Sequence, residues 1–397
     1  MPSPVAARVM PARPGPLARL RAWWGGHALA QLLLVAGVAA LFALAGANIA
    51  ETMRQIGLSP GFAFLDRSAN FEIGESLTGF RGGDPYRAAL LAGFLNTLKV
   101  AIAGCVLATL LGTMLGIAGL SRNPLVAGLV RTYVELVRGT PLLLQLFFWI
   151  SLAQAFPAPR QALSAFDALF LTNRGVYVPS LVLDAGTGPF WTVLALALAG
   201  MAAALLALRS CAALRARPVL LVLLAGGATV VAAFVASGAS LRLDIPSLSG
   251  FNIRGGHVLT PEFAALLTGL TVKFSAAIAE IVRAGIQSVG QGQWEAARAV
   301  GLGRAQIMRL VVLPQALRVI TPMVTSSYLD LVKDSSLAVA IGYPDLVSVA
   351  NTTANTTGQS LEALLILISA YLALNLSISG LMNLYNHRVV SRGSARS

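Results

Sequence analysis

The sequence has few of the residues that build metal sites and disulfides. It contains only two cysteines, Cys105 and Cys211, and three histidines, His27, His257 and His387. Two cysteines are too few for a disulfide framework or a cysteine-rich metal site. The histidines lie too far apart in the sequence for the short spacing of zinc ligands. We therefore expect no metal and no cofactor, with each histidine in a loop or at an interface.

Charged residues are also scarce. Asp, Glu, Lys and Arg make up 11% of the chain, whereas they make up about a quarter of a soluble domain. Hydrophobic residues reach 56%, and the mean hydropathy is +0.74. This composition predicts an integral membrane protein. The net charge of +13 would suit nucleic acid, but the basic residues are divided among separate loops, so no nucleic-acid partner is expected.

Two kinds of catalytic motif are lacking as well. The sequence has no Gly-x4-Gly-Lys-Ser/Thr loop, which binds nucleotide phosphates. It also has no recognisable set of nucleophile and base. A membrane-embedded enzyme is therefore disfavoured, and ATP hydrolysis is not expected of this chain.

Long apolar segments predict the membrane spans, since a spanning helix needs about 20 mostly apolar residues. Eight segments qualify, some of them tilted or broken: 28–50, 90–119, 125–155, 190–208, 218–238, 262–285, 312–342 and 361–386. The pair at 190–208 and 218–238 is nearly all Ala, Leu and Val and is interpreted as an insertion into a five-span core. The segments 156–189 and 240–261 are rich in Pro, Gly and Ser and are expected to be exposed external loops.

The distribution of charge predicts the topology, because an excess of Lys and Arg marks cytoplasmic loops. Three segments hold several arginines and no acidic residue: 1–27, 209–217 and 387–397. Most of the acidic residues lie in 51–89, 156–189 and 240–262. We therefore expect both termini and the segment 286–310 in the cytoplasm, in agreement with an even number of spans.

Residues 1–50 allow a second interpretation. A basic start, an apolar run and Ala45-Gly46-Ala47 resemble a cleaved secretory signal. The apolar run is longer than a typical signal core, and cleavage would leave an odd number of spans. We favour a retained anchor.

The polar segment between the sixth and seventh spans predicts a helix–turn–helix elbow that projects into the cytoplasm. A short helix is expected from Trp294 to Val300, and Gly301 can adopt the left-handed conformation that ends a helix. A second helical run is expected from Ala305 until Pro314. The spacing of Glu-Ala-Ala, Gly and Leu-Pro resembles the EAA loop of binding-protein-dependent ABC importer permeases. The matching residues are Glu295, Ala296, Ala297, Gly301, Leu313 and Pro314, with Val311 at the usual isoleucine position.

Several charged residues lie at membrane depth, where such groups usually face a polar cavity or a partner. They are Lys99, Arg131, Glu135, Arg138, Lys273, Glu280, Arg283, Asp330, Lys333 and Asp334. Three pairs of opposite charge are spaced three residues apart, which places both members on one helix face. The pair of Glu280 and Arg283 is interpreted as structural, whereas Lys99 and Lys273 can simply extend toward an interface. Gly112 and Gly116 have the spacing that permits close helix contact.

Two spans are interrupted by polar segments. In Arg138-Gly-Thr-Pro141 the proline disfavours helical geometry at Thr140, and Asp330-Leu-Val-Lys-Asp-Ser-Ser336 interrupts the span after the elbow. Broken backbone at this depth is tolerated only inside protein or along a water-filled cavity. Asp330 and Lys333 could instead merely neutralise each other. The candidate residues of a substrate pathway are Thr140, Pro141, Gln145, Asp330, Lys333, Asp334 and Ser335.

Further motifs narrow the resemblance to one branch of the importers. The segments at 133–145, 291–297, 314–318 and 333–337 are similar to permeases for polar amino acids, of the His/Glu/Gln/Arg/opine type. The long first external loop and the inserted helix pair resemble the Q-type subunit of general L-amino acid permeases, or its glutamate/glutamine/aspartate counterpart. The resemblance covers residues 90–155 and 262–386, about half of the chain.

This resemblance implies an all-α integral membrane protein with the type I ABC importer transmembrane fold, extended by an N-terminal span and the inserted pair. The implied partners are a cytoplasmic ABC ATPase dimer seated on the elbow, a second permease subunit, a periplasmic amino-acid-binding protein and the lipid bilayer. The implied location is the bacterial inner membrane. The chain then divides into 1–89 with the first span and long external loop, core segments 90–155 and 262–386 flanking 156–261, and a tail at 387–397.

One rival function uses the intramembrane carboxylates differently. In a secondary transporter, buried Asp and Glu residues would couple transport to protons or sodium ions. This hypothesis leaves the elbow unexplained, and the sequence shows no inverted repeat. The importer permease is therefore the preferred interpretation.

Overall fold

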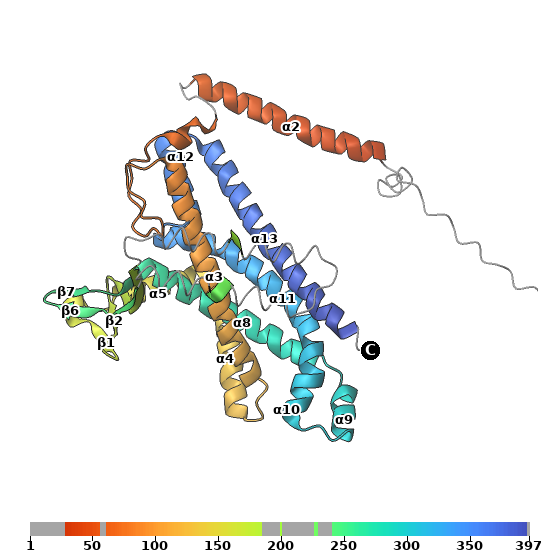
Figure 1. Ribbon diagram of the computed structural model, residues 1–397. Helices are drawn as coiled ribbons and strands as arrows, with labels where there is room; N and C mark the ends of the chain where they lie inside the picture. The colour runs from red at the N-terminus through yellow and green to blue at the C-terminus, as the bar shows by residue number, and fades with distance from the viewer. Residues whose placement is uncertain (1–27, 56–60, 185–198, 201–225, 229–239, 395–397) are drawn as a thin grey trace, which may run out of the picture.

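The computed structural model describes residues 28–55, 61–184, 199–200, 226–228 and 240–394 (Figure 1). Its α-helices are α2 (Ala28–Gln55), α3 (Tyr86–Ala118), α4 (Pro124–Gly139), α5 (Leu142–Gln154), α8 (Pro261–Gln287), α9 (Gln291–Ala299), α10 (Arg304–Ile307), α11 (Leu313–Asp334), α12 (Leu346–Thr357) and α13 (Ser360–Ser394). Shorter helical turns are the 3-10 segments η2 (Phe62–Asp66), η3 (Pro159–Gln161) and η5 (Ser335–Ile341) and the π-helical turn η4 (Met308–Val312).

Within the described residues, five helical stretches are long and apolar enough to cross a membrane. They are Leu29–Ile49, Tyr86–Ala118, Pro261–Gln287, Arg304–Ile341 and Ser360–Asn386. The bent pair of α4 and α5 provides a sixth candidate. These six correspond to the predicted N-terminal span and five-span core. The predicted pair at 190–208 and 218–238 lies almost wholly outside the described residues.

The contact between α3 and α8 is close because glycines on α3 meet the backbone of α8. A Cβ at Gly112 would lie 2.8 Å from the Ser275 carbonyl oxygen, and a Cβ at Gly116 would lie 2.7 Å from the Ala279 carbonyl oxygen. No side chain fits at these distances, so the Gly-xxx-Gly spacing serves a helix contact inside this chain. The buried faces of both helices join the main apolar core, which also includes residues of α5, α11 and the elbow.

The segment before α3 is packed against the bundle. Phe64 and Phe80, with Tyr86 at the start of α3, form an apolar cluster together with Leu346 and Val349 of α12. In Figure 1 this cluster lies at the end of the bundle opposite to α9 and α10. Helix α2 extends away from the other helices, and most of its described side chains are exposed.

The segments 156–189 and 240–261, expected as loops, contain short β-strands. These are β1 (Leu163–Ala165), β2 (Leu169–Thr172), β3 (Gly175–Val178), β4 (Ser180–Asp184), β5 (Ser240–Asp244), β6 (Ser247–Ser249), β7 (Asn252–Arg254) and β8 (His257–Leu259). The order β1-β2-β3-β8 forms one antiparallel sheet, while β6 pairs with β7. Side chains alternate between more and less buried along β2 and β3, the pattern of a half-covered strand.

Strands β4 and β5 form a two-stranded stem. Their register runs from Ser180 opposite Asp244 to Asp184 opposite Ser240. Segment 185–239, which contains the predicted inserted pair, therefore leaves and re-enters the described fold at one point.

The predicted elbow is confirmed as a helix–turn–helix. Helix α9 ends in a Schellman motif, because the amide of Gly301 donates to the Arg298 carbonyl and the amide of Leu302 donates to the Ala297 carbonyl. Gly301 has φ +83°, the left-handed conformation that glycine adopts without strain. The second helix does not end at Pro314 as expected. The π-helical turn η4 connects α10 to α11, so the stretch from Arg304 is continuous and Pro314 lies inside it. Proline lacks the amide that an α-helix interior requires, and the α-helical pattern is interrupted by the π-turn directly before it.

Candidate functional site

The site is built around the break between α4 and α5, whose axes differ by 103°. Thr140 is extended, with φ −100° and ψ 134°, and Pro141 precedes the first residue of α5. The predicted interruption of this span is therefore confirmed. The break frees backbone carbonyls of α4 that would otherwise be bonded within the helix.

Thr140 and Gln145 satisfy those carbonyls. The Thr140 hydroxyl lies 3.1 Å from the carbonyl oxygens of both Leu136 and Val137. The Gln145 amide nitrogen donates to the Val137 carbonyl at 3.0 Å and to the Thr140 hydroxyl at 2.7 Å. These side chains hold the broken backbone in place, a role that is compatible with lining a pathway but does not require a substrate.

A lysine from α8 reaches the break. The Lys273 ammonium donates to the Thr140 carbonyl oxygen at 3.4 Å. Lys273 was not among the predicted site residues. The sequence nevertheless indicates that its partner lies on another element, because no acidic residue is three or four positions away on its own helix. The structure thus gives the lysine a polar partner on another helix.

The end of α11 brings acidic groups to the same region. Asp334 lies at the end of α11, next to Lys333 and within electrostatic range of Asp330 and of Lys273 on α8. Asp330 and Lys333 also form an ion pair at 3.5 Å, with both side chains 61% exposed. The candidate site therefore combines the carbonyl of the break with two ammonium groups and two carboxylates from α8 and α11.

Ser335 has a different environment from its neighbours. It is buried, and its hydroxyl donates to the Val332 carbonyl at 2.8 Å, where α11 changes into η5. Its hydroxyl group is therefore bonded within the turn and is not exposed to a ligand.

The elbow presents one face outward and buries another. Ala297 belongs to the main apolar core together with Ile307 of α10. Glu295 and Ala296 are exposed, as is Val300, with 79% of its surface accessible. Leu313 and Pro314 are also exposed, at the start of α11. The elbow packs on the core through Ala297, while the polar Glu295 and the apolar Val300 stay exposed beside Gly301.

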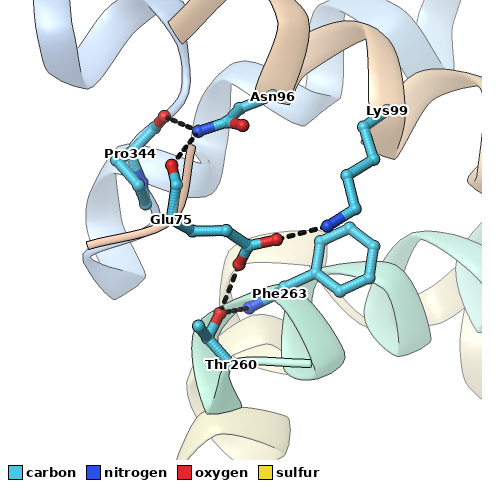
Figure 2. Close-up of polar contacts among 6 residues, drawn as sticks. All are labelled: Glu75, Asn96, Lys99, Thr260, Phe263 and Pro344. Atoms are coloured by element: carbon cyan, nitrogen blue, oxygen red, sulfur yellow. Dashed lines mark hydrogen bonds and ion pairs between the residues drawn. The ribbon is translucent and has the colours of Figure 1, made fainter. Parts of the chain in front are cut away.

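A second polar cluster joins the segment before α3 to the side of α3, to the start of α8 and to the segment before α12 (Figure 2). The Glu75 carboxylate forms an ion pair with Lys99 and accepts a hydrogen bond from the Thr260 hydroxyl at 2.7 Å. The Lys99 ammonium lies 4.1 Å from the centre of the Phe263 ring, and Asn96 donates to the backbone carbonyls of Glu75 and Pro344. Lys99 therefore has a partner and does not extend toward an interface.

Thr260 links this cluster to the start of α8. Its hydroxyl oxygen accepts from the Phe263 amide at 3.2 Å, which caps the helix. Glu75 thus touches the cap of α8 and the side of α3 at once. Because Glu75 and Lys99 are largely buried, with 11% and 20% of their side chains exposed, the cluster fixes this end of the bundle.

Comparison with known proteins places the chain in a family. Residues 213–391 match the model for the binding-protein-dependent transport system inner membrane component. The chain is 45% identical to the putative amino-acid ABC transporter permease protein YhdX of Escherichia coli, with 93% of this chain and 94% of that protein aligned. It is 41% identical to the general L-amino acid transport system permease protein AapQ of Rhizobium johnstonii, over 86% of each chain.

The chain is also similar to a third permease and to one solved structure. The glutamate/glutamine/aspartate/asparagine transport system permease protein BztB of Rhodobacter capsulatus is 37% identical, over 90% of this chain and 91% of that protein. The crystal structure of an amino acid ABC transporter with histidines matches 76% of this chain and 95% of its own, with 22% identity and a TM-score of 0.45. The sequence relatives alone carry the assignment. The chain belongs to the family of inner membrane components of binding-protein-dependent transport systems, the permeases of ABC importers.

Proposed function

We propose that this permease moves polar L-amino acids into the cytoplasm. The observation that carries the proposal is the arrangement at the broken span, where the Lys273 ammonium donates to the Thr140 carbonyl and lies within electrostatic range of Asp334, the neighbour of Lys333. A free amino acid has one carboxylate and one ammonium group, so its transient site needs donors beside acceptors. The names of the aligned relatives, all amino-acid permeases, support the same substrate class.

The residues divide into two roles. Lys273 and Lys333 attract the substrate carboxylate, while Asp334 and the Thr140 carbonyl accept hydrogen bonds from its ammonium group. Both lysines already have a partner in the protein, since Lys333 pairs with Asp330 and Lys273 donates to the Thr140 carbonyl. Exchange of partners keeps the site weak, which a transport pathway needs because the substrate must leave again.

The elbow couples this site to an ATPase. The helical stretch Arg304–Ile341 begins at the elbow and contains Asp330, Lys333 and Asp334. Glu295, Ala296 and Val300 lie at α9, before the turn at Gly301, and Ala297 of α9 shares the apolar core with Ile307 of α10. A force on α9 is therefore passed to α10, where the helical stretch that contains the acidic residues begins. In the proposed cycle, closure of a cytoplasmic ABC ATPase dimer moves the elbows and rocks the spans between inward-open and outward-open states.

The other proposed partners follow from the same assignment. A periplasmic amino-acid-binding protein delivers the substrate, and a second permease subunit supplies the other half of the pathway. Both termini lie in the cytoplasm, and the first span stays as an anchor in the bacterial inner membrane. ATP hydrolysis belongs to the partner ATPase, and this chain requires no cofactor. The ion-coupled alternative is disfavoured, because the relatives are ABC permeases.

Reconstitution in vesicles tests the proposal. The permease, co-expressed with its ATPase, second permease and binding protein, is expected to take up several L-amino acids with ATP and without a proton or sodium gradient. Lys273→Ala and Lys333→Ala are each expected to lower uptake by about tenfold, the loss of roughly one charge-assisted hydrogen bond. The control is Arg87→Ala, which removes an exposed ion pair with Asp66. Uptake driven by an ion gradient without ATP, or restricted to sugars, would contradict the proposal.

A further inference from the structure

A charged cavity, separate from the broken span, lies between the end of α3, the body of α4 and the second half of α8. Its volume is about 400 Å³. Lys273, Glu280 and Gln287 follow one another at intervals of seven residues on α8, so they share one face of the helix. The first reaches the broken span, and the other two line the cavity. The cavity therefore continues the polar face of α8 from the candidate site toward the elbow.

The cavity contains five charged side chains, of which only two are paired with each other. The Arg283 guanidinium forms an ion pair with Glu280 and donates to the Gln287 side chain at 2.8 Å. Arg131, Glu135 and Arg138 make no hydrogen bond or ion pair with any residue that the structure describes, although the charge of Arg138 acts on Glu280.

Unpaired charges at this depth call for a partner. Charged groups in a membrane protein are costly unless they face a polar cavity or a counter-charge. Two guanidinium groups on one face of α4, those of Arg131 and Arg138, line this cavity. A guanidinium group has the planar, double-donor geometry that binds carboxylates. A volume of about 400 Å³ lies within the range of small-molecule sites, roughly 300–1,000 Å³.

The cavity also has an excess of positive charge. Three arginines and two glutamates line it (Arg131, Arg138, Arg283, Glu135 and Glu280), which leaves one net positive charge. An amino acid with two carboxylates complements this excess, whereas a cationic side chain is repelled.

We propose that this cavity is an inner binding station, in which Arg131 and Arg138 hold the carboxylates of an amino acid after it leaves the broken span. It favours acidic amino acids over basic ones. Glu135 accepts from the α-ammonium group of the substrate. The inference rests on the proposed amino-acid transport and adds a second site with its own selectivity.

Competitive uptake tests this station. Vesicles containing the full complex are loaded with ATP, and uptake of labelled glutamate is measured relative to alanine and lysine. Arg131→Gln and Arg138→Gln are each expected to lower the glutamate-to-alanine ratio by about tenfold, because each removes one charged donor. ATP-dependent alanine uptake is expected to continue. The matched control, Arg87→Gln, changes an exposed arginine outside the cavity.

The outcomes separate the two proposals. If the wild-type complex transports no amino acid, the proposed function itself fails. If it transports amino acids but neither arginine variant changes the ratio, the inner station is wrong. An equal loss of all substrates would assign the arginines a structural role and also overturn it. Repeating the assay in vesicles of phosphatidylcholine with and without phosphatidylglycerol adds a last test, because a ratio that follows the anionic lipid would make the cavity a site for lipid phosphate.

Discussion

Replacing Gly301 by valine tests whether the shape of the elbow determines its grip on the ATPase. Gly301 has φ +83°, and a Cβ added there would meet no atom within 4 Å. The cost is therefore conformational rather than steric. A residue with a Cβ loses about 1–2 kcal/mol in the left-handed region, and a β-branched side chain lies at the upper end of this range or above it.

This conformational free energy lowers the fraction of molecules in which the turn at Gly301 is formed. A free-energy change of about 1–2 kcal/mol is a factor of roughly 5–30 in an equilibrium constant. The amides of Gly301 and Leu302 would lose their bonds to α9 whenever the turn opens. We therefore expect Gly301→Val to weaken ATPase binding by about 5–30-fold, while the core anchored by the spans stays folded.

Asparagine provides the matched control, since it tolerates the left-handed conformation better than other residues. Gly301→Asn is expected to bind the ATPase within about threefold of the native protein. The measurements are co-purification of the ATPase and its hydrolysis stimulated by the binding protein in nanodiscs, with elution on size exclusion as the check of folding. Native binding by the valine variant, or equal loss in both variants, would refute the reasoning.

Three further predictions concern stability of the purified permease. Gly112→Ala places a methyl group 2.8 Å from the Ser275 carbonyl and should lower the melting temperature, whereas Gly128→Ala, with open space around its Cβ, should not; equal melting temperatures would contradict the close α3–α8 contact. Lys99→Met leaves the largely buried Glu75 carboxylate without its cation and should cost about 3 kcal/mol, which a second change of Glu75 to Gln should partly restore in thermal unfolding. Burial raises the pKa of Asp345 from 3.8 to about 7, so the folded state favours the protonated carboxyl group. Its contribution to the free energy of unfolding, at most about 4 kcal/mol, is present below pH 4 and is lost as the pH rises through 7. Asp345→Asn, which can still cap α12, should flatten the pH dependence of the melting temperature between pH 4 and 8, and an unchanged slope would refute this.

The sequence predicted those features whose causes are local. Long apolar runs must become helices in a membrane because the backbone has no other hydrogen-bond partners there. Pro141 marked the break, and Gly301 marked the turn of the elbow. The direction of the bend and the π-helical turn before Pro314 were not predicted, because a proline indicates that regular hydrogen bonding is interrupted but not how the chain responds.

The site depends on contacts that no spacing rule reveals. Lys99 finds its partner in Glu75, which lies 24 residues away in a segment with no regular structure. Lys273 reaches a carbonyl 133 residues earlier in the chain. The strands in 156–189 and 240–261 were missed because each is three to five residues long, too short for alternation to stand out from turn composition.

The stem of β4 and β5 makes segment 185–239 a detachable cassette. Asp184 and Ser240 face each other in register, so their Cα atoms are separated by only about 5 Å. A two-residue turn could join them directly and leave every other described strand and helix at its place. A chain shortened at this point can therefore keep the described helices and strands on either side of it, because both ends of the removed segment already lie side by side.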